Sequence, residues 1–184
     1  NLSEAEVSNI DARIEYYFSD NESISFGVFS KEIANAIERT TDVIAGSGNR
    51  VIYGFDNGGD ATAEGIEISA SKDFDFERYG LRITANASVF DTEVEEINAS
   101  GFLLRKRALQ GQPELLANIQ VALDDYETER ELTFVFNHTG ESLFAVPSND
   151  NLADEMLLAR NVLDIRFKQS FNETMSLSAS LENV

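Results

Sequence analysis

The fold is decided by ALQGQPELLANIQVALDDYETERELTFVFN, residues 108–137. Apolar side chains occupy alternate positions of its first half, with mostly polar ones between them: Leu115, Ala117, Ile119, Val121 and Leu123 against Glu114, Asn118, Gln120 and Asp124. A period of two is that of a β-strand with one apolar and one polar face. Residues 125–130 form a polar run that predicts a turn, and alternation returns at 132–137. The segment therefore predicts a β-hairpin with one apolar face.

The same alternation recurs along most of the chain. It predicts strands at about 7–18, 24–31, 64–71, 81–89, 115–124, 132–137, 156–167 and 175–181. Residues 32–40, EIANAIERT, either prolong the second strand or form a helical turn. Residues 40–60 contain AGSGN and DNGGD, and this glycine content predicts a long connection with at most a short strand extension at 51–55.

The connections between these strands alternate in length. Short turns lie near Asp20, Asp75, Glu127 and Ser170, and long connections lie between them, at about 40–60, 91–111 and 139–154. Outer-membrane barrels have short periplasmic turns at one end and long loops at the other. We therefore predict an all-β fold: an antiparallel up-and-down meander of about eight strands that forms part of a transmembrane β-barrel.

The aromatic residues also indicate a membrane-spanning wall. One group surrounds the short turns: Tyr16, Tyr17, Phe18, Phe74, Phe76, Tyr79, Tyr126, Phe167 and Phe171. A second group lies near the opposite strand ends: Phe29, Phe55, Phe90 and Phe136. Two aromatic girdles around an aliphatic band are typical of segments that cross a bilayer. The apolar faces are therefore predicted to meet lipid.

Composition excludes several classes of protein. The chain carries 33 Asp and Glu against 14 Lys and Arg, a net charge of −19, which argues against nucleic-acid binding. It has no cysteine, and so no disulfide or thiolate metal site. It also has no run of eighteen apolar residues, so no transmembrane helix is predicted, although spanning strands need none.

No stretch of the chain carries a catalytic or metal-binding pattern. DNGGD at 56–60 resembles the start of a calcium loop, but Gly58 replaces a ligand and Ala61 replaces the required glycine. His138 is the only histidine, which leaves no basis for a catalytic triad or a zinc site. Carboxylates are too numerous to single out a glycosidase pair. The sequence predicts a protein that is not an enzyme and needs no cofactor.

Several segments together resemble the C-terminal part of the barrel of TonB-dependent outer-membrane receptors. In chain order they are IEYYF with SISFGVFSKEIANAIER, GGDATAEGIEIS, LRITANASVFDTE, LQGQPELLANIQVALDD and ELTFVFNHTGE. The resemblance implies a parent barrel of about 22 strands filled by an N-terminal plug. Residues 1–184 would then be a partial barrel domain without the plug, the energy-coupling motif or the final strands. How its open strand edges are satisfied is left undecided.

The resemblance also implies a function. It implies an active-transport receptor in the outer membrane of a Gram-negative bacterium, driven by the TonB energy-coupling complex through the absent plug. The cargo would be a scarce nutrient: a ferric siderophore, cobalamin or an oligosaccharide. This segment does not choose among them.

Residue roles follow from the two faces. Apolar residues would face lipid, for example Ile14, Ile83, Ile119 and Phe134. Their polar neighbours would face the lumen, where the resemblance implies contact with the plug: Arg13, Glu15, Glu67, Arg82, Asn118 and Gln120. In the long loops, Tyr53, Phe55 and Phe102 are predicted to contact the cargo.

Two alternatives remain open. A soluble, secreted β-sandwich or small barrel that acts as a binding module would explain the alternation and the acidity, but not the one-sided long loops or the aromatic bands. A passive porin-like or adhesin barrel shares the physics of the wall and differs in lacking the plug.

Overall fold

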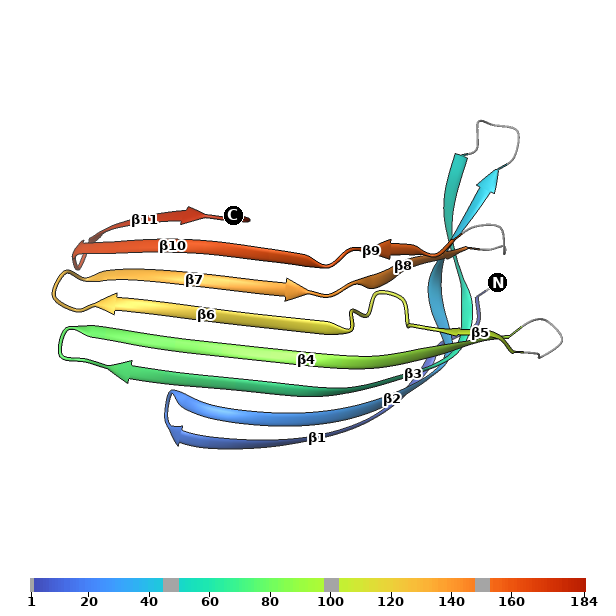
Figure 1. The fold of residues 1–184 in the computed structure, drawn as a ribbon, viewed down its shortest axis with the longest axis horizontal. Helices are drawn as coiled ribbons and strands as arrows, with labels where there is room; N and C mark the ends of the chain where they lie inside the picture. Colours follow the sequence, from blue (N-terminus) through green and yellow to red (C-terminus); the bar gives the residue numbers. More distant parts are fainter. Residues whose placement is uncertain (1, 45–49, 98–102, 148–152) are drawn as a thin grey trace.

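The chain forms one curved sheet, shown in Figure 1. The computed structural model describes residues 2–44, 50–97, 103–147 and 153–184. These residues contain eleven strands, in the order β11-β10-β7-β6-β4-β3-β2-β8-β9, with β1 on β2 and β5 on β4. Across those ranges, no helix is long and apolar enough to cross a bilayer.

Eight long strands form the predicted up-and-down meander. They are β1 (Glu6–Ser19), β2 (Glu22–Ile44), β3 (Arg50–Asp75), β4 (Tyr79–Ile97), β6 (Leu115–Asp125), β7 (Arg130–Thr139), β10 (Arg160–Asn172) and β11 (Met175–Leu181). Each pairs antiparallel with the next. Figure 1 shows the four short turns at one end of the sheet and the longer connections at the other, as the sequence predicts.

Three shorter strands lie within the long connections. They are β5 (Leu103–Arg107), β8 (Ser142–Pro147) and β9 (Glu155–Leu157). β5 pairs antiparallel with the end of β4, and β9 pairs antiparallel with β8. β8 pairs in parallel with β2, so two strands that are not neighbours in the meander meet at this end.

The connection predicted at 40–60 is too long. β2 extends to Ile44 and β3 begins at Arg50, so the predicted extension at 51–55 and DNGGD are both part of a strand, while AGSGN at 45–49 lies outside the described residues. Residues 32–40 prolong the strand and form no helical turn. The register shifts beside Ala36, where Asn35 has φ 52° and Gly59 has φ 117°. Glycine here allows a bulge in a strand, which alternation and composition alone do not distinguish from a loop.

Two further boundaries differ from the prediction. The strand predicted at 156–167 is divided, because β9 ends at Leu157 and β10 begins at Arg160. Residues 156–159 read MLLA, and alternation begins only after this apolar run. The connection predicted at 91–111 is also partly strand, since β4 extends to Ile97 and β5 returns along it.

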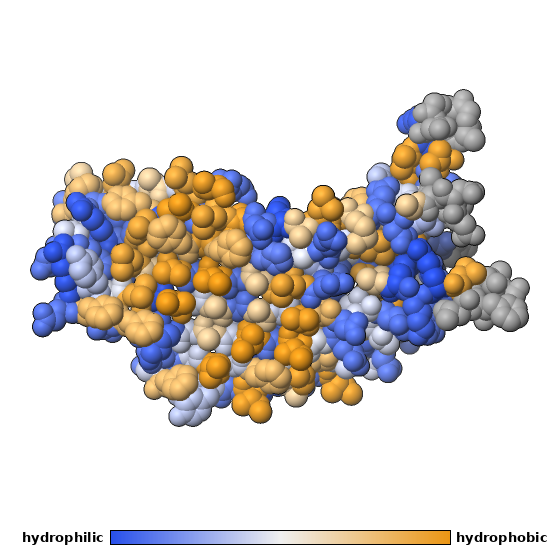
Figure 2. Space-filling model, viewed as in Figure 1, coloured by the Kyte–Doolittle hydropathy of each residue, from blue (hydrophilic) through white to orange (hydrophobic). Residues whose placement is uncertain are grey.

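The strand register aligns the apolar faces. One row of directly opposed residues crosses seven strands: Tyr16, Ile24, Ala70, Ala85, Ile119, Phe136 and Leu163. Opposed residues point to the same side of a sheet, so the row is a continuous apolar surface. Its side chains remain open to the surroundings, and Ile14, one row further along β1, is 76% exposed. Figure 2 shows the resulting band of apolar residues between hydrophilic ends.

The length of this band suits strands that cross a bilayer. On β4 the outward positions from Leu81 to Val89 are all apolar. A tilted strand crosses the apolar part of a bilayer in about 9–11 residues, and this stretch is of that length. At the boundary of the band nearer the long connections, the next row is polar, with Ser30 opposite Glu64 and Glu64 opposite Asp91.

Most of the buried residues lie at the end with the long connections. Ala36, Ala61 and Val94 form a small core cluster, against which Ile33 and Leu109 pack. Leu109 belongs to the LQGQP segment, whose Gly111 N–H donates to the Leu143 carbonyl at 2.8 Å. This segment therefore crosses the sheet between the outer parts of β2, β4 and β8.

Candidate functional site

The six predicted lumen residues lie together on the polar face of the sheet. Arg13 and Glu67 both lie opposite Gly27, and Glu67 lies opposite Ser88. The next row runs from Glu15 through Ser25, Ser69 and Asn86 to Asn118. Arg82 shares the side of Asn86 because it lies four residues away, and Gln120 lies opposite Thr84.

Hydrogen bonds connect several of these side chains. Arg13 forms an ion pair with Glu15 at 2.5 Å and donates to the Ser25 hydroxyl at 3.2 Å. Arg82 donates to both carboxylate oxygens of Asp73, at 2.8 and 3.1 Å. The Asn118 amide donates to Asn86 at 2.8 Å.

Small residues make this polar face shallowly hollow. Gly27, Ser25, Ser69 and Ser88 leave a pocket of about 230 Å³, which Arg13, Glu67 and Asn86 also line. The face can therefore accept hydrogen-bonding groups from a partner close to its backbone.

Two aromatic residues also lie on this face, contrary to the prediction. Phe29 and Phe90 both oppose Gly65, and their ring centroids are 5.7 Å apart. A Cβ added at Gly65 would collide with the Phe29 ring, so glycine makes room for it. The assignment of these residues to a lipid-facing girdle was wrong. Strand parity carries the missed signal, because Phe29 follows the outward-facing Val28.

The predicted cargo contacts lie on the outer half of the β2–β3 hairpin. Tyr53 packs edge-on against Phe144 of β8, with centroids 6.1 Å apart, and its hydroxyl donates to Glu155 at 3.2 Å. Phe55 lies opposite Arg39 and is 64% exposed. The third predicted contact, Phe102, lies outside the described residues.

Arg39 joins this group through Phe144. Its guanidinium carbon lies 4.4 Å from the centroid of the Phe144 ring, a cation–π arrangement. The hydrogen bond from Tyr53 to Glu155 raises the pKa of the Tyr53 hydroxyl, so that side chain stays a neutral donor. We call Arg39, Tyr53, Phe55 and Phe144 the Arg39 patch. Sequence reasoning missed Arg39 and Phe144, because alternation does not reveal that β8 pairs with β2.

A buried ion-pair network lies beside the patch. Arg107 donates to both oxygens of Glu38, at 2.8 and 2.5 Å, and only 7% and 3% of these two side chains are exposed. Arg107 also donates to Glu96 at 2.5 Å, and Arg105 donates to the same carboxylate at 2.6 Å. Arg105 continues to Asp154, with two bonds of 2.8 Å. The network thus joins β2, β4, β5 and the residue just before β9.

The network changes the proton affinities of its members. Burial raises the pKa of Glu96, but hydrogen bonds from Arg105 and Arg107 outweigh it and hold that pKa below its usual value. Burial lowers the pKa of Arg107, whereas its bonds to Glu38 and Glu96 raise it, with a net increase. Glu96 and Arg107 therefore both remain charged at neutral pH.

The LQGQP segment completes the network. Gln110 accepts from the Arg39 backbone N–H at 2.5 Å and donates to the Arg39 carbonyl at 2.8 Å. Its own N–H donates to Glu38 at 3.2 Å. Gly58 leaves the space that this carboxylate occupies, because a Cβ there would collide with Glu38. Sequence reasoning singled out LQGQP as a motif but not this contact.

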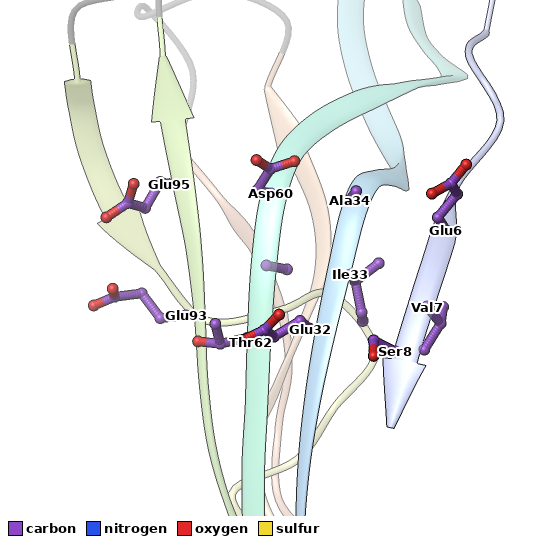
Figure 3. A pocket seen from close by; sticks show the side chains of 11 residues that line it. Glu6, Val7, Ser8, Glu32, Ile33, Ala34, Asp60, Thr62, Glu93 and Glu95 are labelled. Atoms are coloured by element: carbon purple, nitrogen blue, oxygen red, sulfur yellow. The ribbon is translucent and has the colours of Figure 1, made fainter. Parts of the chain in front are cut away.

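A second cluster of charges lies just beyond the apolar band. A pocket of about 470 Å³ lies between β1 and β4, and five of the residues that line it are acidic: Glu6, Glu32, Asp60, Glu93 and Glu95. Figure 3 shows how they are placed on neighbouring strands. Lys106 pairs with Glu93 at 2.6 Å and with Glu95 at 2.9 Å. In the described part of the chain, no group of three or more His, Cys, Asp or Glu residues is placed to hold a metal ion.

These features define a class of protein. A single sheet of long antiparallel strands, with an exposed apolar band, a polar reverse face and long connections at one end, is a segment of a transmembrane β-barrel wall. The chain belongs to the TonB dependent receptor-like, beta-barrel family, whose model matches residues 1–184.

Solved structures support the fold. The chain is similar to the FrpB iron transporter of Neisseria meningitidis, with 14% identity and a TM-score of 0.62, over 97% of this chain and 26% of that one. It is equally similar to a mutant of the ferric enterobactin receptor PfeA of Pseudomonas aeruginosa, with 17% identity and a TM-score of 0.62, over 98% and 26%. The chain thus spans about a quarter of each neighbour's length. No curated protein matches it.

Proposed function

We propose that this chain is part of the barrel wall of an outer-membrane active-transport receptor of a Gram-negative bacterium. The receptor imports a scarce nutrient with energy from the TonB complex, which acts through a plug domain. The observation that carries the proposal is the in-register apolar band, whose length suits tilted strands that cross a bilayer, on a sheet that matches the receptor-barrel family along its whole length.

The exposed band supports a lipid environment over a soluble one. The described strands belong to one sheet, and no second layer covers the apolar rows in the part of the chain that the structure describes. A soluble β-sandwich would bury such rows between two sheets. Lipid supplies the missing cover, and the polar face then looks into the lumen.

The polar face supports a contact with a plug. Arg13, Glu67 and Asn118 present charges and an amide along a face of small residues. Such groups make hydrogen bonds with a hydrophilic partner and disfavour an apolar one. The proposed protein is a transporter and not an enzyme, so the polar face has a binding role only.

The outer end supports cargo capture. The Arg39 patch offers a cation and exposed aromatic surface at the end where outer loops lie. A ferric siderophore, cobalamin and an oligosaccharide all remain candidate cargoes. Both structural neighbours are named for iron uptake, which makes a ferric siderophore the first cargo to test.

The transport proposal is tested by uptake into whole cells that carry the complete receptor. Receptor-expressing and receptor-deleted cells are offered each of the three cargoes, with and without an uncoupler of the proton gradient. We expect receptor-dependent uptake of one cargo that stops when the gradient collapses. Uptake that continues unchanged without the gradient would indicate a passive porin and contradict the proposal.

The orientation of the wall is tested with two adjacent residues on opposite faces. Ile68→Cys and Glu67→Cys are each labelled with an environment-sensitive fluorophore in the complete receptor, without other cysteines, in lipid vesicles. We expect a lipid-soluble quencher to act on the label at position 68 and to spare the label at 67. Equal quenching at both positions would mean that neither face is specific for lipid.

A further inference from the structure

The outer half of the β2–β3 hairpin leaves the direction of the sheet. In Figure 1 it turns away from the other strands at the end with the long connections. The turn coincides with the bulge at Asn35 and Gly59, where both residues have positive φ. A bulge bends a strand and weakens local pairing, so this part of the hairpin needs other contacts to fix its direction.

Those contacts come from residues far away in the sequence. Arg107 holds the Glu38 carboxylate from β5, 69 residues away. Gln110 forms hydrogen bonds with both backbone groups of Arg39, as a neighbouring strand would. β8 adds its parallel pairing at Thr40 and Thr41. Contacts from distant segments therefore hold four consecutive residues of β2, from Glu38 to Thr41.

We propose that the Glu38–Arg107 ion pair and Gln110 form a clamp that fixes the outer half of the β2–β3 hairpin against β8 and so assembles the Arg39 patch. The clamp and the patch share one short piece of strand. Glu38 points into the network, while Arg39, the next residue, points to Phe144 on the other side. Moving Glu38 therefore moves the Arg39 guanidinium. Only the role of the patch in cargo binding rests on the proposed function.

The depth of the ion pair makes the clamp sensitive to single changes. An ion pair exposed to water contributes little, but losing one partner of a buried pair leaves an uncompensated charge. Gly58 supplies an independent way to disturb the pair, because alanine there displaces Glu38 without removing any charge. Lys106 supplies a matched control, since it neighbours Arg107 on β5 but forms its ion pairs on the opposite, exposed face.

The test measures the closeness of β2 and β8 in the complete receptor. The chain contains no cysteine, so Thr40→Cys and Val146→Cys can be introduced as a reporter pair, with any cysteine elsewhere in the receptor replaced. These residues are direct partners in a parallel pair, at a spacing that suits a disulfide. The rate of disulfide formation under a mild oxidant is compared among Arg107→Met, Gly58→Ala and Lys106→Met, in protein shown by circular dichroism to be folded.

We expect Arg107→Met and Gly58→Ala to slow cross-linking by about tenfold or more, and Lys106→Met to leave the rate unchanged. In the same variants, affinity for a ferric siderophore that the receptor takes up should fall with the first two changes only. Unchanged cross-linking in both Arg107→Met and Gly58→Ala would overturn the clamp. Slower cross-linking with unchanged cargo affinity would overturn its role in assembling the patch. Cross-linking needs no cargo, so it tests the clamp even if transport is not found.

Discussion

At the scale of single residues, Glu96 shows how a charge is held at the outer end of the sheet. It accepts hydrogen bonds from Arg105 and Arg107, and it is partly buried between them. Nothing in the sequence around VEEI marks this residue out from its acidic neighbours. Its partners come from β5, so their position depends on how the chain returns along β4.

The lowered pKa of Glu96 predicts a pH dependence. A carboxyl group whose folded pKa lies below its unfolded value stabilises the fold above the unfolded value, near 4.5, and loses that contribution as the pH falls through the folded value. At neutral pH the receptor should therefore melt at a higher temperature than its Glu96→Gln variant, and the difference should disappear in acid. Thermal melting of both proteins between neutral and acidic pH measures this. A difference that grows in acid would contradict the assignment.

At the scale of elements, the sequence predicts strands well where one face meets lipid and the other meets polar surroundings. β6 and β7 follow from alternation alone, because each position has a fixed environment. The sequence pattern did not predict the outer parts of β2 and β3, because both of their faces meet other protein or water and the alternation of apolar and polar residues weakens. β8 was missed, and β9 was not distinguished from β10, for a further reason. They are short, and their pairing is decided by distant strands.

The same reasoning extends to the candidate site. The six polar-face residues were found together because their spacing within strands is even and the register follows from short turns. Arg107 and Glu38 were not found, since 69 residues separate them and no periodicity connects them. Contacts made by irregular segments thus cannot be predicted from the sequence pattern and are seen only in the structure.

A pair of substitutions in β6 tests the division between the two faces. Ile119 lies at the middle of the apolar positions of its strand, and Gln120 points to the other face. A lysine at the bilayer midplane costs about 2–4 kcal/mol. We expect Ile119→Lys to lower the free energy of unfolding in lipid vesicles by about that amount, and Gln120→Lys to change it by less than about 0.5 kcal/mol. Denaturant titration measures both, and similar losses in the two variants would contradict the assignment of faces.

At the scale of the whole molecule, the sheet is an open segment of a barrel. In the part of the chain that the structure describes, β1 pairs only with β2 and β11 only with β10. Free strand edges promote association in water and are not tolerated in hydrocarbon. In the proposed receptor, other strands of the barrel would pair with these two edges.

The open edges predict how the isolated 184-residue segment behaves. In plain buffer it should aggregate or remain unfolded, because its apolar rows find no cover. In detergent it should gain β structure yet form oligomers through β1 and β11. Light scattering and circular dichroism, with and without detergent, distinguish these states. A monodisperse, cooperatively folding monomer in plain buffer would contradict the membrane wall.

The parallel pairing of β8 with β2 also constrains the order of folding. Tight turns join antiparallel strands only, so this contact cannot grow from a neighbouring hairpin. The nearby bond between Tyr53 and Glu155 spans 102 residues of chain. Such a distant contact becomes favourable only after the intervening strands have shortened the gap between its ends. We therefore expect the end of the sheet with the long connections to acquire its shape late, after the strands from β2 to β7 have paired.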